Sequence, residues 1–385
     1  MSDKQADREE KPTQGYHIDR RFFIGSSLFS IACRQKNARG FRGFAFVANY
    51  DGQAIAAVDL QVFAVVRHIR LDANPTAVIA HPDRPQVFAL TPANGAIHRI
   101  DLGTLNVEAK RVLARSATTV RLSPQGDCLW LLAAPERKLI RVDLDTLNPE
   151  AIVAIPEGAT DIDFSPATPF AVLSLGESGR AAVIDLRTRR VAYQTQLGPA
   201  AGPVKYLKNG RLLLVGSPAE QSLVVLDAES GRRVVELPLS LKPERFCFKQ
   251  DGGQLFVTGP GLDAVAVVYP YQTQVAGTLL AGHAPGAMAA SADPDFLFVA
   301  NRDSGEVTAL DIQTQKVRAV VPVGSVPDFI AITPDNNFAL VLNRGSGDMA
   351  VIRVDAMAGR RTKAGPLFTM IPVGSTPVAA VVATI

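Results

Sequence analysis

The stretch PDFIAITPDNNFALVLNRGSGDMAVIRVD, residues 327–355, contains three short apolar runs separated by turn residues. With the run that follows it, the stretch predicts strands at residues 329–333, 338–342, 349–354 and 368–373. The turn at residues 334–336 is typical of a hairpin, because proline fixes φ and asparagine tolerates positive φ. The stretch therefore predicts one four-stranded antiparallel unit without a helix.

The same unit recurs along the chain with a nearly fixed period. Aspartates that close a β-rich run follow one another 42 residues apart at Asp59, Asp101, Asp143, Asp185 and Asp227, and Tyr269, Asp311 and Asp355 take the next slots. A period of this size, filled with short strands, indicates an all-β fold, a single β-propeller of four-stranded blades. Each aspartate is expected to accept a backbone N–H two residues on and so close a turn.

The number of strands predicts the size of the ring and how it closes. Innermost strands are predicted to begin near Thr76, Thr118, Thr160, Pro203, Glu244, Gly286, Asp328 and Val378. Sets of the other three strands are predicted to begin near Phe44, Gln86, Cys128, Phe170, Arg211, Gln254, Phe296 and Phe338. We therefore expect eight blades, or seven if the unit at 211–237 is irregular. The last strand, at 377–384, is expected to pair with the first three and close the ring, which hides two sheet edges.

Charge is nearly balanced in the predicted propeller. The net charge of the whole chain is +3, but from Phe44 onward 31 basic residues face 32 acidic ones. Nucleic-acid binding relies on clustered Lys and Arg, so we expect no nucleic-acid partner. We expect a monomer with no cofactor and no metal site, because no histidine has a partner at metal-ligand spacing and no catalytic motif occurs.

The first 33 residues resemble a bacterial export signal. Arg20 and Arg21 precede Phe23, Ile24 and a short uncharged run, as in the twin-arginine signal. The sequence SIAC that ends at Cys33 resembles a lipobox, which implies lipidation of that cysteine, and a plain signal peptide cut before it is the alternative. Residues 34–43 form a basic linker that would lie against anionic head groups. Residues 44–385 form the propeller. The expected location is the periplasmic side of the bacterial envelope, anchored to the membrane.

Two resemblances concern the repeats. The sequence FVAN at 46–49 and 298–301, each followed by a strand ending in Asp59 or Asp311, and VGSVP at 323–327 are similar to the YVTN-type propeller repeat. This resemblance implies an exported propeller that is often seven-bladed. The expected count of eight is more similar to the d1-haem propeller group, which includes exported proteins of haem d1 assembly.

The remaining cysteines and histidines favour structural roles. Cys128 and Cys247 lie in apolar strands of different blades and are expected to be free buried thiols. His81 and His98 are expected on the surface of a turn and of a strand.

Polar residues predicted to gather at one face of the ring are the candidate site. The links into the innermost strands and the turns between the two middle strands of a blade converge there, and they supply Asp161, Lys205, Glu244, Arg245, His283, Arg302, Asp328 and Arg344. A funnel of mixed charge can bind a polar or anionic small molecule. The alternative is that these side chains only pair with one another.

Three functions are compatible with this sequence. The first is an exported binding or interaction protein without catalysis, which would hold a protein partner or a small anionic ligand at the funnel. The alternative is a funnel enzyme or accessory protein, either a lactonase-like hydrolase or a tetrapyrrole or haem d1 handling protein. Related lactonases use acids and an arginine in the funnel, which Asp161, Glu244, Arg245 and Asp328 could match. A purely structural envelope protein is the third.

Overall fold

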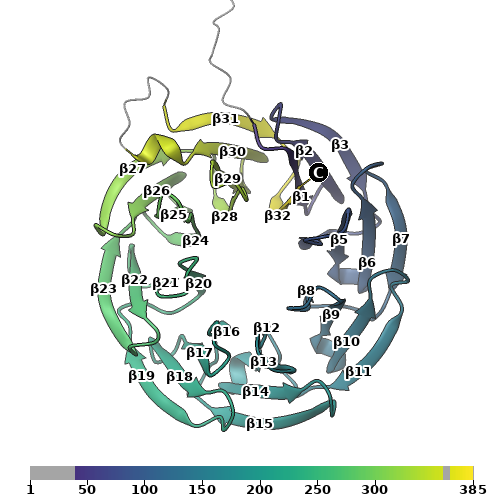
Figure 1. Ribbon diagram of the computed structural model, residues 1–385, viewed down its shortest axis with the longest axis vertical. Helices are drawn as coiled ribbons and strands as arrows, with labels where there is room; N and C mark the ends of the chain where they lie inside the picture. Colours follow the sequence, from purple (N-terminus) through teal and green to yellow (C-terminus); the bar gives the residue numbers. More distant parts are fainter. Residues whose placement is uncertain (1–39, 359–364, 385) are drawn as a thin grey trace, which may run out of the picture. The chain divides into compact units, whose positions relative to one another are not determined.

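The protein is described by a computed structural model that covers residues 40–358 and 365–384. Within these ranges the chain forms 32 strands in eight four-stranded antiparallel sheets, which are the blades of a ring (Figure 1). The fold is a β-propeller of eight blades, as the period predicts. Arg20, Arg21 and Cys33 lie outside the described residues.

The first four blades are listed from the innermost to the outermost strand. Blade 1 consists of β32 (Pro377–Thr384), β1 (Gly43–Asn49), β2 (Ala54–Asp59) and β3 (Ala64–Arg70). Blade 2 consists of β4 (Ala77–Ala80), β5 (Gln86–Thr91), β6 (Ala96–Asp101) and β7 (Val107–Val112). Blade 3 consists of β8 (Thr119–Leu122), β9 (Cys128–Ala133), β10 (Lys138–Asp143) and β11 (Pro149–Ala154). Blade 4 consists of β12 (Asp161–Phe164), β13 (Phe170–Ser174), β14 (Arg180–Asp185) and β15 (Arg190–Gln196).

The other four blades have the same order. Blade 5 consists of β16 (Val204–Tyr206), β17 (Leu212–Ser217), β18 (Ser222–Asp227) and β19 (Arg233–Pro238). Blade 6 consists of β20 (Arg245–Phe248), β21 (Leu255–Thr258), β22 (Ala264–Tyr269) and β23 (Gln274–Leu280). Blade 7 consists of β24 (Pro285–Ala290), β25 (Phe296–Asn301), β26 (Glu306–Asp311) and β27 (Lys316–Pro322). Blade 8 consists of β28 (Pro327–Ile332), β29 (Phe338–Asn343), β30 (Asp348–Arg353) and β31 (Leu367–Pro372). Short 3-10 turns lie at η1 (Pro92–Asn94), η2 (Ala134–Glu136), η3 (Gly176–Ser178) and η4 (Asp355–Ala358).

The unit at 211–237 is regular, so the seven-bladed alternative is set aside. Its strands β17, β18 and β19 pair along their lengths as in the other blades. The middle strands of most blades are buried on both faces, because each blade is packed between two neighbours. All six residues of β9 and of β25, for example, are buried. This explains why these strands appear in the sequence as continuous apolar runs and not as alternating ones.

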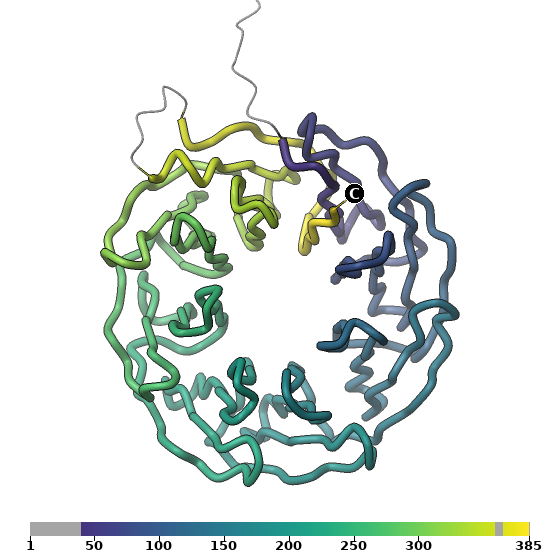
Figure 2. The backbone as a smooth tube through the Cα atoms, viewed as in Figure 1, coloured from purple at the N-terminus to yellow at the C-terminus, as the bar shows by residue number. Residues whose placement is uncertain are grey.

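The last strand closes the ring as predicted. β32 pairs antiparallel with β1, so blade 1 joins segments from both ends of the described chain (Figure 2). Phe63, in the turn after β2, lies with its ring centroid 5.1 Å from that of Phe338 and 4.8 Å from that of Phe368. These edge-to-face contacts join blade 1 to blade 8 across the closure.

Glycines in the links between blades allow close contact with asparagines. Asn49, Asn301 and Asn343 are buried at the ends of β1, β25 and β29. A Cβ atom placed on Gly282 would lie 2.5 Å from the side-chain nitrogen of Asn301, and the equivalent distances are 2.7 Å for Gly324 and Asn343 and 2.8 Å for Gly374 and Asn49. Only a residue without Cβ fits these positions, so the glycine of each link and the strand-ending asparagine form one packing unit.

The periodic aspartates close turns, with one correction. The Asp59 and Asp185 carboxylates accept the N–H two residues on, whereas those of Asp101, Asp143, Asp227 and Asp311 accept the N–H three residues on. The prediction for Asp355 is wrong. Arg353 pairs with Phe338 as Asp59 pairs with Phe44, and Asp355 lies in η4, beyond the end of β30. The period of 42 therefore reaches Arg353, and the longer last interval marks an irregular turn.

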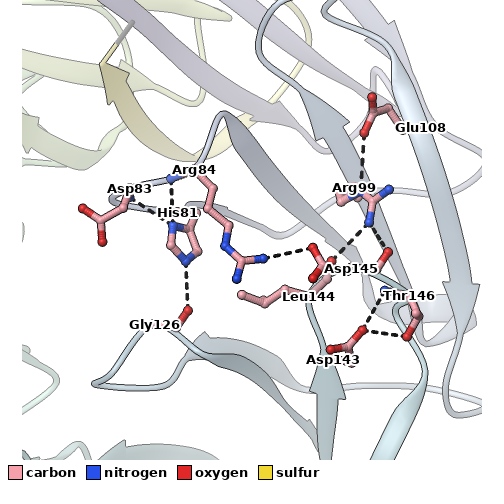
Figure 3. Close-up of polar contacts among 10 residues, drawn as sticks. All are labelled: His81, Asp83, Arg84, Arg99, Glu108, Gly126, Asp143, Leu144, Asp145 and Thr146. Carbon is pink, nitrogen blue, oxygen red and sulfur yellow. Dashed lines mark hydrogen bonds and ion pairs between the residues drawn. The ribbon is translucent and has the colours of Figure 1, made fainter.

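The two histidines expected at the surface are buried. His81 holds blade 2 against blade 3: its Nε2 lies 2.8 Å from the carbonyl oxygen of Gly126, and its Nδ1 accepts the N–H groups of Asp83 and Arg84 (Figure 3). Arg84 extends the contact through an ion pair of 2.9 Å with Asp145. His98 lies 3.1 Å from the Thr91 hydroxyl. The surface prediction was wrong for both because turn and strand positions here face a neighbouring blade.

Cys128 and Cys247 are free cysteines, as expected. They belong to β9 and β20, in different blades. Burial raises the pKa of the Cys128 thiol and raises that of Cys247 to about 12. Both thiols are therefore poor nucleophiles at neutral pH. No helix among residues 40–358 and 365–384 is long and apolar enough to cross a membrane.

Candidate ligand-binding site

One face of the ring gathers the candidate residues, and we call it the funnel face. It is formed by the turns between the two middle strands of each blade, such as 302–305 and 344–347, and by the links that lead from an outermost strand to the next innermost strand, such as 239–244 and 281–284. Antiparallel pairing places all these connections at the same end of their blades. The innermost strands surround the axis of the ring (Figure 1).

Four of the predicted residues form one ion-pair network on this face. Arg302, in the turn after β25, donates hydrogen bonds of 2.8 and 2.5 Å from Nε and Nη2 to one oxygen of Asp328 on β28. Arg245, at the start of β20, lies 3.8 Å from that same oxygen. Glu244 lies 3.8 Å from Arg302 and 3.9 Å from Arg245. The network thus joins blades 6, 7 and 8, and we call these four residues the arginine cluster.

The arginine cluster is partly accessible to solvent. The side chains of Glu244 and Arg245 are 45% and 47% exposed, whereas that of Asp328 is 21% exposed. A cavity of about 210 Å³ adjoins the cluster and is lined by Glu244, Arg302 and the loop that contains Asp263. Asp328 is therefore held firmly by Arg302, while Glu244 is only loosely engaged and faces the cavity.

Asp161 and Lys205 belong to a second group, on the innermost strands of blades 3 to 5. The Asp161 carboxylate accepts the backbone N–H of Val204 at 3.2 Å and lies 3.6 Å from Arg121. Lys205 pairs with Asp163 at 2.8 Å. Each of these contacts joins neighbouring innermost strands and so stabilises the inner wall of the ring. The same side chains place charges along that wall.

His283 lies on the funnel face with two carboxylates near its ring. Its Nδ1 is 2.6 Å from Asp263, and its Nε2 is 3.9 Å from Asp303. The hydrogen bond to Asp263 raises the pKa of His283 above its ordinary value of 6.5. The Asp263 carboxylate also accepts the N–H of Ala284, which fixes its orientation. The histidine is therefore half of an acid–base pair at the edge of the cavity.

Arg344 stands apart from the other predicted residues. Its backbone N–H donates to Val326 at 2.9 Å, and its side chain is exposed with no ion pair among the residues that the structure describes. Of the eight predicted residues, four lie in one ion-pair network, and His283 lies beside the adjoining cavity. Arg344 occupies the same kind of turn as Arg302, one blade further on.

Sequence reasoning missed Arg121 and Asp263 as members of these groups. Arg121, Asp163 and Lys205 are spaced 42 residues apart, so they occupy the same register position in consecutive innermost strands. The period could therefore have found Arg121. Asp263 lies in a turn of blade 6 and carries no such signal. Within residues 40–358 and 365–384, no group of three or more His, Cys, Asp or Glu side chains could hold a metal ion.

Comparisons with known proteins agree on the propeller fold. A family model described as lactonase, 7-bladed beta-propeller, matches residues 257–370, which is less than half of the chain. Among curated proteins, none matches this sequence. Among solved structures, dihydro-heme d1 dehydrogenase NirN in complex with DHE is similar with a TM-score of 0.74 at 15% identity, over 88% of this chain and 75% of that one. Hydrazine synthase of Kuenenia stuttgartiensis is similar with a TM-score of 0.57 at 18% identity, over 75% of this chain and 98% of that one.

The comparisons bear on blade number as well. The family model is named for a seven-bladed ring, but the chain has eight blades. The matched residues 257–370 contain the His283–Asp263 pair together with Arg302 and Asp328. The YVTN-type resemblance and export remain predictions.

Proposed function

We propose that this chain is an exported propeller that binds a carboxylate-bearing tetrapyrrole at its funnel face and serves tetrapyrrole handling. The observation that carries the proposal is the arginine cluster, which brings two guanidinium groups from different blades to one carboxylate, with Arg302 lining the adjoining cavity. Arginine forks bind carboxylates in a planar, bidentate geometry. The likeness to a solved dehydrogenase of dihydro-haem d1 supports this ligand class.

Glu244 is the residue that a ligand would displace. Its distances of 3.8 and 3.9 Å to the two arginines lie beyond hydrogen-bonding range. A ligand carboxylate can approach more closely and exchange a loose ion pair for direct hydrogen bonds. Asp328 would stay in place and hold the Arg302 fork in a fixed orientation, so less ordering entropy is lost on binding.

The inner wall of the ring is apolar on one side and charged on the other. β32, β4 and β24 carry no charged residue, and their Val, Ile, Met and Ala side chains are partly exposed. β28, between β24 and β32, carries one charged residue, Asp328. β8, β12, β16 and β20 carry Arg121, Asp161, Asp163, Lys205 and Arg245. A flat apolar macrocycle with acidic substituents matches such a division, because its body and its charged rim need different surroundings.

The test is a titration with iron protoporphyrin IX, whose two propionates are the groups to be recognised. We expect a saturable change in Soret absorbance with one equivalent bound. Arg302→Lys and Arg245→Lys keep the charge but lose the planar fork, and each should weaken binding about tenfold, the equivalent of about 1.4 kcal/mol. Arg344→Lys is the matched control and should bind as the parent does. Equal affinity in all four proteins, or the absence of saturation, would contradict the proposal.

The His283–Asp263 pair favours a second candidate, hydrolysis of a lactone. A histidine hydrogen-bonded to a carboxylate can take a proton from water as it attacks an ester carbonyl. This pair lies in the segment matched by the lactonase model. Turnover of a simple aliphatic lactone, measured by acid release, should then disappear in His283→Gln and persist in Arg344→Lys. Turnover that His283→Gln leaves unchanged would remove this candidate.

The interaction scaffold without catalysis, with a protein partner at the funnel, remains a further hypothesis. The protein partner would bind the same face, and the titration with iron protoporphyrin IX distinguishes this hypothesis from ligand binding. Export and membrane anchoring are part of the proposal, supported by the sequence around Arg20, Arg21 and Cys33. The mass of the mature protein, purified from membranes, would show whether Cys33 carries lipid.

A further inference from the structure

The face opposite the funnel face carries a larger cavity, between blades 4 and 5. Its volume is about 560 Å³, which is in the range of small-molecule sites. It is lined by turns that follow innermost strands and turns that precede outermost strands, with Thr168, Phe170, Tyr206, Arg211, Ala228 and Glu229 among the lining residues. These turns lie at the other end of the blades from the arginine cluster, so the cavity is separate from the proposed tetrapyrrole site.

Ala228 lines this cavity, which is larger than the cavities of about 290 and 300 Å³ that Leu186 and Ile312 line elsewhere in the ring. It follows the periodic Asp227, and the same position holds a branched aliphatic side chain in six other blades: Leu60, Leu102, Leu144, Leu186, Ile312 and Val354. Leu144, for example, is buried in the core between blades 2 and 3. Ala228 occupies the corresponding place between blades 4 and 5 but lacks the methyl groups that would fill it.

Tyr206 supplies the only hydroxyl at its own repeat position. Ala80, Leu122, Phe164, Phe248, Ala290, Ile332 and Val382 occupy the same register in the other innermost strands. Tyr206 is 7% exposed, and its hydroxyl has no hydrogen-bond partner within the described part of the chain. Leaving such a group unsatisfied destabilises the folded state, a cost that a phenylalanine would avoid.

Tyr193, a neighbouring tyrosine, has the hydrogen-bond partner that Tyr206 lacks among the described residues. The Tyr193 hydroxyl, in the same core cluster, donates to the carbonyl oxygen of Ala228 at 2.6 Å. Burial raises the pKa of Tyr206 far above its usual range, so the phenol stays protonated and can donate. Two departures from the repeat, a missing side chain and an added hydroxyl, therefore coincide at one blade interface. A packing defect alone would explain the first but not the second.

We propose that the cavity lined by Tyr206 and Ala228 binds a small aromatic molecule that carries a hydroxyl or carbonyl oxygen. The rings of Phe170 and Tyr206 offer aromatic contact for the body of the ligand. Solvent does not reach the Tyr206 hydroxyl in this structure, so the ring must turn slightly for the hydroxyl to donate to the oxygen. Arg211 and Glu229 are exposed at the cavity and keep its mouth hydrated.

The experiment uses 4-methylphenol and toluene as paired probes, with affinity measured by calorimetry on the full chain. We expect saturable one-to-one binding of 4-methylphenol. Ala228→Leu restores the side chain typical of the other blades and should weaken both probes at least tenfold. Tyr206→Phe should weaken 4-methylphenol about tenfold and leave toluene unchanged. Tyr193→Phe removes a hydroxyl that already has a partner and should leave both affinities unchanged.

Each outcome decides the proposal. Failure of the parent protein to bind 4-methylphenol would overturn it, as would full affinity in Ala228→Leu. If Ala228→Leu does not fold, Tyr206→Phe carries the test, because removing an unsatisfied hydroxyl should not lower the melting temperature. Equal loss of both probes in Tyr206→Phe would show that the hydroxyl does not recognise the oxygen and would also contradict the proposal.

Discussion

Arg302 and Asp328 come from different blades, yet Nε and Nη2 of the arginine share a single carboxylate oxygen at 2.8 and 2.5 Å. The pair joins blade 7 to blade 8 and also sets the direction in which the guanidinium presents its remaining N–H groups. The contact between the two blades and the proposed ligand recognition therefore depend on the same ion pair. A change at either residue should be visible both in stability and in binding.

Arg302→Ala should lower the free energy of unfolding by about 1–2 kcal/mol, because Asp328 is mostly buried and keeps only the longer contact to Arg245. Urea denaturation measures the change. Arg344→Ala removes an arginine from the equivalent turn and should change stability by less than about 0.5 kcal/mol. Equal losses in the two variants would mean that the ion pair contributes nothing specific.

His98 should make the protein less stable in mild acid. Burial lowers the pKa of His98 below its ordinary value of 6.5, although Asp72 at 3.3 Å acts in the opposite direction. The unfolded chain therefore binds a proton at higher pH than the folded chain, and stability falls as the pH drops below about 6.5. Denaturation midpoints between pH 8 and 5 should show the fall, and it should be smaller in His98→Gln. An identical pH dependence in the two proteins would contradict the assignment.

His283 should have the opposite effect on stability to His98 and should stabilise the protein in mild acid. Its pKa is raised by Asp263, so its contribution is fully present below about pH 6.5 and is lost as the pH rises through the folded-state pKa. Titration of the imidazole proton by NMR should give a midpoint above 6.5. In Asp263→Asn the midpoint should move down toward 6.5. A midpoint that Asp263→Asn leaves in place would show that the pair does not form in solution.

Gly324→Ala should destabilise the protein by about 1–3 kcal/mol through overpacking. The new Cβ would lie 2.3 Å from the Ser346 hydroxyl oxygen and 2.7 Å from the side-chain nitrogen of Asn343. Gly365→Ala is the control, because nothing lies within 4 Å of its Cβ position. Thermal unfolding of the two variants gives the comparison, and a melting temperature lowered equally in both would exclude the steric explanation.

Phe63→Ala should weaken the closure of the ring by about 2 kcal/mol, because it removes aromatic contacts to Phe338 and Phe368. Arg189 occupies the equivalent turn of blade 4 with a similar φ, 59° against 55° at Phe63. Arg189→Ala should therefore have little effect. Hydrogen exchange of β1 and β32 amides should increase in Phe63→Ala alone, and unchanged protection there would contradict a role in closure.

The repeat could be predicted because each blade is built from the same local rules. Strands, hairpin turns and the aspartate turns all follow from residues within one unit. The innermost strand of each blade and the strand next to it begin within one residue of the starts predicted from the ring count. The aspartate period fails in blade 8, where Arg353 occupies the position of the aspartate. Arg353 stacks over the Phe368 ring at 4.3 Å, so a cation replaced the aspartate there without disturbing strand pairing.

The candidate site was predicted only in part, because its contacts cross between blades. The period places Glu244, Arg302 and Asp328 on one face, but it does not show which side chains reach one another. Burial of His98 depends on the blade packed against it, which no local pattern reports. The unsatisfied hydroxyl of Tyr206 was invisible for the same reason, since Leu, Phe and Tyr are equivalent in an apolar strand pattern.

The pairing of β1 with β32 also affects how the chain folds while it is being synthesised. Asn49 at the end of β1 and Val373 just before β32 are 324 residues apart in sequence. At about 5–20 residues per second, a ribosome makes the second partner roughly 15–65 seconds after the first. Throughout that interval the inner edge of β1 has no strand beside it, so a cell must shield this edge from other chains. We expect the nascent protein, and not the finished ring, to be the form most dependent on chaperones.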